Sequence, residues 1–220
     1  MGNSMTMLYA SLFLKGILVT LAATCLAGII SLILGTVLGI VSSYYIGLIR
    51  IRRIIQMYTF LCKGIPCYVQ ILIAYFMLPA ILGINVSGFV AAVCALAICS
   101  SGYVTEIIRS SINAIDKGQW DASFVLGYSL PKTLLYIILP QMLRNGLLPL
   151  LGELQQVMQG TCLLATVGVT ELTRVGMNII SRDLNPLPIY TIIAFFYLLL
   201  GGLLQLVMIC VERKIKHGNR

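Results

Sequence analysis

Charged residues are scarce in this chain of 220 residues. Asp, Glu, Lys and Arg make up 10% of it, whereas roughly 25% is typical of soluble domains. Histidine and tryptophan each occur once, as His217 and Trp120. With 59% hydrophobic residues, a protein of this size could not hide its apolar surface from water. We therefore expect an all-α integral membrane protein.

Several kinds of site lack their usual residues. The seven cysteines include no C-x-x-C pair and lie mostly in apolar runs, so they are interpreted as small buried hydrophobes. The single histidine lies in the polar tail, so we expect no metal site. No nucleotide-binding Gly-x-x-x-x-Gly-Lys-Ser/Thr loop is present. We expect a chain that is no enzyme and binds no cofactor itself.

Uncharged runs divide the chain into about five predicted transmembrane helices, since roughly 20 apolar residues cross a bilayer. The basic and apolar residues of 51–63 predict an amphipathic segment near the cytoplasmic surface. A polar stretch over 106–132 predicts a loop with short helical content, and Glu106 and Arg109 are spaced for an i,i+3 pair. The predicted spans lie within 16–49 and at about 65–82, 87–109, 133–160 and 184–211.

The net charge of +8 comes from 15 basic and 7 acidic residues. No basic patch is interleaved with aromatic residues, so we expect no nucleic-acid partner. Lys and Arg concentrate after the first span, in the middle loop (about 110–132) and in the tail. The positive-inside rule then places the N-terminus outside and the C-terminus inside, with the middle loop cytoplasmic. We expect a single transmembrane domain over 1–220.

The middle loop carries a spaced motif. Asp121-Ala122-Ser123 is followed by Gly127 and then by Ile137, Leu139 and Pro140. This pattern resembles the signature loop of type I ABC importer permeases, Glu-Ala-Ala-x-x-x-Gly followed, after nine residues, by Ile-x-Leu-Pro. The spacing matches throughout, while Asp121 and Ser123 replace Glu and Ala. The resemblance implies a loop that couples a cytosolic ATPase to the membrane helices, with Gly127 free to adopt positive φ.

Other segments resemble the polar amino-acid permeases of the histidine, glutamine and arginine type, over about residues 12–212. They are Gly16-x-x-x-Thr20-Leu21, Lys63-Gly64-Ile65-Pro66 with Gln70, Glu106–Arg109, Lys117-Gly118-Gln119, Leu139-Pro140-Gln141 and Gly168-Val169-x-Glu171-Leu172. The sequence departs from the family pattern at Lys63, which replaces Arg. It departs again at Gln159-Gly160-Thr161-Cys162, which replaces Lys-Asp-Thr-Ser.

This resemblance implies a permease subunit in a bacterial cytoplasmic (inner) membrane. Its expected substrate is a polar amino acid such as glutamine, histidine or arginine. Its expected partners are a second copy or a homologous permease, two ATP-binding subunits and an extracytoplasmic substrate-binding protein.

Polar residues in and near the spans are candidates for the substrate path. Glu153 lies within the fourth predicted span, and Gln156 shares its helix face at i+3. An intramembrane carboxylate usually faces a cavity or a partner. We predict a path lined by Glu153, Gln156, Gln159, Lys63 and Gln70. A structural glutamate satisfied by neighbouring helices is the alternative for Glu153.

Other interpretations stay open at this point. Trp120 could contact the ATPase or anchor the loop at the membrane surface. The chain could be an ABC permease for another small solute, such as methionine. A stand-alone carrier would predict internal repeats, and an intramembrane enzyme would need a catalytic pair; the sequence shows neither.

Overall fold

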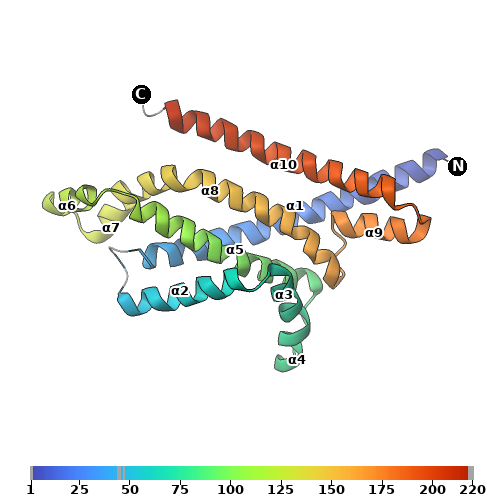
Figure 1. Ribbon diagram of the computed structural model, residues 1–220, viewed down its shortest axis with the longest axis horizontal. Helices are drawn as coiled ribbons and strands as arrows, with labels where there is room; N and C mark the ends of the chain where they lie inside the picture. The colour runs from blue at the N-terminus through green and yellow to red at the C-terminus, as the bar shows by residue number, and fades with distance from the viewer. Residues whose placement is uncertain (1, 44–45, 47, 218–220) are drawn as a thin grey trace.

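The computed structural model describes residues 2–43, 46 and 48–217, and the side chains of 7–43, 46 and 48–214. All regular elements in these ranges are helical. Four long helices run along the molecule: α1 (Gly2–Val41), α5 (Gly88–Asn113), α8 (Leu139–Gly160) and α10 (Pro186–His217) (Figure 1). The segments long and apolar enough to cross a membrane are Met7–Val41, Gly88–Asn113, Leu130–Val167 and Pro186–Lys214.

A fifth crossing exists if two bent helices count as one span. Helix α2 (Ile49–Gly64) meets a second helical segment at an angle of 98°. That segment comprises α3 (Cys67–Leu72), a π-helical turn at Ile73–Met77, and α4 (Leu78–Leu82). The four or five spans found within the described residues confirm the predicted all-helical membrane fold.

The structure corrects the prediction for residues 51–82. The amphipathic segment predicted at 51–63 lies within α2, which packs along α5 and buries Ile55, Thr59 and Cys62. These positions recur at i, i+4 and i+7, which places them on one helix face. The predicted span at about 65–82 is not a crossing by itself, because Cys67–Leu82 is long and apolar enough to cross only together with Ile49–Gly64.

Gln70 stabilises the bend between α2 and α3. Pro66 is the N-cap of α3, and as a proline it has no N–H to continue the α2 ladder. The Gln70 amide nitrogen donates to the carbonyl oxygens of Cys62 and Ile65, at 2.8 Å each. In an apolar surrounding, these donations satisfy carbonyls that a broken helix would otherwise leave unpaired.

Small residues bring α1 close to α5. A Cβ on Gly35 would lie 2.5 Å from the Val104 Cβ, and one on Gly39 would lie 2.6 Å from the Ile108 Cβ. Glycines at such crossings let membrane helices approach closely. Helix α5 consequently forms the buried centre of the bundle, between α1, α2 and α8.

Two motifs far apart in the sequence meet where α9 (Leu172–Asp183) begins. Thr20 accepts a hydrogen bond from the Leu172 N–H at 3.2 Å, and a Cβ on Gly16 would lie 3.1 Å from the Leu172 Cα. Gly168, at φ 83°, ends the 3-10 helix Thr161–Val167. Glu171 is fully buried and caps α9 by accepting from the N–H groups of Thr173 and Arg174.

Burial raises the pKa of the Glu171 carboxyl above its usual range, although the capping N–H groups and the Tyr197 hydroxyl oppose this shift. The folded state therefore holds this proton at a higher pH than the unfolded state does. The contribution of Glu171 to the free energy of unfolding falls as the pH rises through the raised pKa.

Replacing Glu171 with alanine is expected to lower the free energy of unfolding by about 2 kcal/mol, because it removes a helix cap. For a chain of this length, that corresponds to a Tm about 4 °C lower, measurable by thermal unfolding in detergent. Glu106→Ala is the matched control, since it removes a carboxylate from a partly exposed ion pair worth about 0–1 kcal/mol. Equal losses in the two variants would contradict the capping role.

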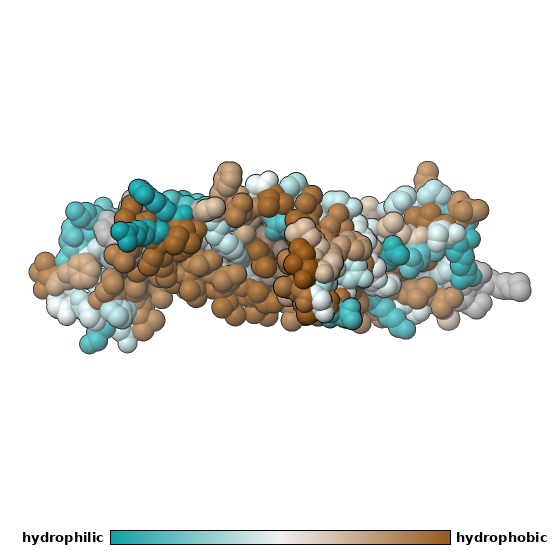
Figure 2. Space-filling view, turned by 90° about the horizontal axis from the view of Figure 1, so that it is seen from below, coloured by the Kyte–Doolittle hydropathy of each residue, from teal (hydrophilic) through white to brown (hydrophobic). Residues whose placement is uncertain are grey.

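The surface and the termini suit a protein that crosses a bilayer. Hydrophobic residues cover the middle of the face in Figure 2, and hydrophilic residues gather toward both ends. The start of α1 and the end of α10 lie at opposite ends of the long axis, as an odd number of crossings requires (Figure 1). The start of α2, helix α6 (Lys117–Val125) and the end of α10 share one end.

Candidate substrate cavity and coupling segment

A cavity of about 440 Å³ lies where α2, α3, α5 and α8 meet. Its volume falls in the range of small-molecule sites, roughly 300–1,000 Å³. Polar and apolar side chains both contribute to its wall. The polar ones are Lys63, Ser100, Tyr103, Glu153, Gln156 and Gln159, and the thiols of Cys67 and Cys99 lie beside them.

Glu153 and two glutamines line this cavity from α8. The Ser100 hydroxyl on α5 donates to the Glu153 carboxylate at 2.7 Å. The side chains of Gln156 and Gln159 are exposed, and their i+3 and i+6 spacing from Glu153 keeps all three on one side of the helix.

Lys63, in the last turn of α2, supplies a cation to the same cavity. Its Nζ lies 5.6 Å from the centroid of the Tyr103 ring on α5, within the range of a cation–π contact. Among the described residues, neither Lys63 nor Glu153 takes part in an ion pair. The cavity therefore presents one ammonium and one carboxylate, and each can still bind a ligand of opposite charge.

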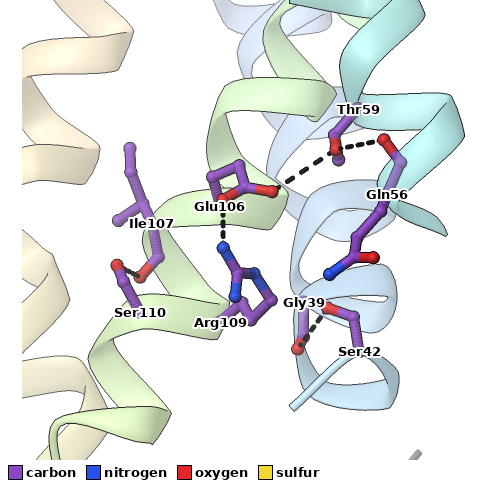
Figure 3. A network of polar contacts seen from close by, with 8 residues as sticks. All are labelled: Gly39, Ser42, Gln56, Thr59, Glu106, Ile107, Arg109 and Ser110. Atoms are coloured by element: carbon purple, nitrogen blue, oxygen red, sulfur yellow. Dashed lines mark hydrogen bonds and ion pairs between the residues drawn. The ribbon is translucent and has the colours of Figure 1, made fainter. Parts of the chain in front are cut away.

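A second polar cluster lies between α2 and the last turns of α5, the helix that precedes α6 (Figure 3). Arg109 pairs with Glu106, which confirms the predicted i,i+3 pair. Thr59 on α2 donates to Glu106 at 3.3 Å and to the Gln56 carbonyl at 3.0 Å. The predicted loop begins too early, because α5 continues to Asn113 and contains both charged residues. This cluster ties α2 to α5.

The segment that follows α5 is a compact pair of short helices. Asp116 caps α6 by accepting from the Gly118 N–H, and the Ser123 hydroxyl lies 2.9 Å from that of Thr133 at the end of α7 (Leu130–Thr133). Trp120 is fully buried beside Ile112 and Met142. Both predicted roles for Trp120, ATPase contact and membrane-surface anchor, are wrong, because the indole is buried against the end of α5 and the start of α8.

Gly127 turns the chain between the two short helices. It has φ +79°, and its N–H donates to the Phe124 carbonyl while the Tyr128 N–H donates to the Ser123 carbonyl, both at 3.0 Å. This left-handed turn matches the conformational role predicted for Gly127.

The turn leaves large apolar side chains uncovered. Val125 is 87% exposed and Leu126 is 73% exposed. The other residues of the motif divide between the surface and the re-entry into the bundle. Asp121 and Ala122 are exposed, Ile137 lies in a π-helical turn at Leu134–Ile138, and Leu139 and Pro140 begin α8.

Comparison with known families decides the assignment. Residues 35–217 match the family described as "Binding-protein-dependent transport system inner membrane component". The chain belongs to this family of membrane permeases.

Two proteins similar to this permease are named as amino-acid permeases. It is 34% identical to the arginine transport system permease protein ArtQ of Bacillus subtilis, over 94% of this chain and 93% of that protein. It is 37% identical to the glutamine transport system permease protein GlnP of Escherichia coli K12, over 70% and 71%.

The permease also resembles a solved structure over nearly its whole length. The crystal structure of an amino acid ABC transporter with histidines has a TM-score of 0.85 and 32% identity, covering 96% of the permease and 97% of that chain. A methionine ABC transporter, MetNI, reaches a TM-score of 0.82 over 93% of the permease and 96% of that chain, at 18% identity. The second similarity shows the shared fold alone.

The structure brings four predicted path residues of the permease together: Lys63, Glu153, Gln156 and Gln159. Gln70 lies outside this cavity, since its amide is committed to the bend and its side chain lines a separate apolar groove. Sequence reasoning missed Ser100 and Tyr103. The available signal was weak: a short polar stretch, Ser100-Ser101, inside an uncharged span.

Proposed function

We propose that the permease forms the path of an amino acid across a bacterial cytoplasmic membrane, in an importer driven by a separate ATPase. The observation that carries the proposal is the cavity between α2, α3, α5 and α8. It offers the carboxylate of Glu153 and the ammonium of Lys63 to a ligand. An amino acid carries the complementary pair, an α-ammonium and an α-carboxylate. The names of the relatives agree with this ligand class.

Two ATP-binding subunits are the proposed partners at the α6 end. The exposed Val125 and Leu126 at the Gly127 turn supply an apolar contact surface on a segment that the buried Trp120 holds against α5 and α8. Basic residues of α2, α6 and α10 gather at this end, which supports a cytoplasmic location by the positive-inside rule. The transmembrane domain proposed for 1–220 would thus have its N-terminus outside, its C-terminus inside and its coupling loop in the cytosol.

A second permease chain and an external binding protein complete the proposed importer. Gln156 and Gln159 are exposed in the single chain, so another copy or a homologue is needed to close the path around the substrate. The opposite end of the bundle, where α9 lies, is the proposed docking side for the substrate-binding protein.

Two native cysteines offer a direct test. Cys67 lines the cavity, whereas Cys94 lies on α5 beside a separate apolar groove and is exposed. In variants that keep only one of these cysteines, L-glutamine is expected to slow N-ethylmaleimide labelling of Cys67 several-fold. Labelling of Cys94 should be unchanged, because a ligand in the cavity does not cover it.

The labelling is measured by mass spectrometry on the purified permease in lipid nanodiscs. If no amino acid, whether neutral, cationic or anionic, protects Cys67, the cavity is not the substrate path and the proposal fails.

A further inference from the structure

The cavity is balanced in charge. Lys63 and Glu153 are the charged side chains among the described residues that line it, and they are opposite in sign. We infer that this cavity selects an amino acid with an uncharged, hydrogen-bonding side chain and discriminates against cationic and anionic amino acids. This inference rests on the proposed function and narrows its substrate class.

The net charge of the ligand decides how well it fits between Lys63 and Glu153. A neutral amino acid brings one ammonium and one carboxylate, so Glu153 and Lys63 can each acquire one partner of opposite sign. A cationic amino acid brings a further positive charge into the cavity that holds Lys63. An anionic one brings a further negative charge near Glu153. Charges are poorly screened between membrane helices, so an unbalanced ligand is disfavoured.

The side-chain specificity comes from two amides. Gln156 and Gln159 line the cavity one helical turn apart, and both are exposed. Each carboxamide offers a donor and an acceptor. A ligand side chain with an amide or a hydroxyl group can pair with them. A purely apolar side chain would leave both carboxamides without hydrogen-bond partners when the path closes. The cavity should therefore bind amino acids with apolar side chains weakly.

The other polar side chains that line the cavity are uncharged. The Ser100 hydroxyl already donates to Glu153 at 2.7 Å, which leaves the carboxylate its acceptor capacity for an ammonium. Gln155 precedes Gln156 on the same helix, but its side chain points toward α10. Its amide nitrogen lies 3.8 Å from the position of a Cβ on Gly201 of α10. The chain thus supplies a glutamine of the same helix that does not line the cavity.

The experiment measures equilibrium binding of radiolabelled L-glutamine, L-arginine and L-glutamate to the purified full-length permease in lipid nanodiscs. L-glutamine is expected to bind at least tenfold more tightly than either charged amino acid. Gln159→Glu adds a carboxylate at almost unchanged side-chain volume. It is expected to strengthen L-arginine binding at least tenfold and to weaken L-glutamine binding.

Gln155→Glu is the matched control, because it adds the same charge on the side facing α10. It should leave the order of the three affinities unchanged, and thermal unfolding checks that both variants are folded. The inference is overturned if the native permease binds L-arginine or L-glutamate as tightly as L-glutamine. It is also overturned if folded Gln159→Glu does not shift preference toward L-arginine, or if Gln155→Glu shifts it equally.

These outcomes separate the two proposals. Tight binding of L-arginine that protects Cys67 from labelling would overturn the selectivity and leave the cavity as the substrate path. Absence of binding and of protection by all three amino acids would overturn both.

Discussion

Replacing Gly127 with valine is expected to abolish most ATP-driven uptake, with a fall of at least tenfold in the assembled importer. Gly127 has φ +79°, a conformation that a β-branched residue adopts only with strain. Among the described residues, apart from its two chain neighbours, nothing lies within 4 Å of a Cβ placed on Gly127, so the cost is conformational rather than steric. The turn would rearrange, and the exposed Val125 and Leu126 would no longer present the proposed ATPase contact. Copurification of the ATPase and amino-acid uptake measure the loss.

Gly83→Val is the matched control for this change. Gly83 has φ +65° and ends α4 far from α6 in the fold (Figure 1). An added Cβ would meet nothing within 4 Å in the described part of the chain beyond its two sequence neighbours. Valine at positive φ should cost a similar conformational free energy at both positions, so the two variants should lose a similar amount of stability. The ATPase should nevertheless remain bound to Gly83→Val. If both valine variants lose the ATPase equally, the effect is general destabilisation and the coupling role of Gly127 is refuted.

Replacing Glu153 with glutamine is expected to weaken amino-acid binding about a hundredfold. The substitution keeps the volume and an acceptor for the Ser100 hydroxyl, so it removes mainly the charge that faces the ligand ammonium. Losing one partner of a buried charge pair costs about 2–5 kcal/mol, and a hundredfold change in affinity corresponds to about 2.7 kcal/mol. Equilibrium binding of L-glutamine to the purified permease measures this loss.

Glu171→Gln separates binding from stability. Glu171 is also a buried carboxylate, but its oxygens are committed to the cap of α9 and to the Tyr197 hydroxyl. Its replacement should lower the Tm and leave the affinity of the folded protein within a few-fold. Unchanged L-glutamine binding in folded Glu153→Gln would instead favour a structural role for Glu153.

The sequence predicted the features that follow from strong local signals. Long uncharged runs indicated most crossings because charge in hydrocarbon is costly. The spaced motif around Gly127 indicated a tight turn because only glycine adopts positive φ freely. The i,i+3 spacing of Glu106 and Arg109 predicted an ion pair that the structure contains.

The misses concern tertiary packing, which local patterns do not contain. The basic start of α2 resembles a surface helix, yet Ile55, Thr59 and Cys62 are covered by α5. Tryptophan is typical of membrane interfaces, but Trp120 is buried with Ile112 of α5 and Met142 of α8. Gln70 resembles a pathway residue in sequence, and only the bend shows that its amide is already occupied.

The bend at Pro66 has a consequence for how the protein enters the membrane during synthesis. Neither α2 nor the segment from α3 to α4 is long and apolar enough to cross alone. Both α2 and α3 pack against α5, which emerges from the ribosome later. We therefore expect residues 49–113 to settle in the bilayer as one unit, with the first half held near the translocation machinery until α5 arrives.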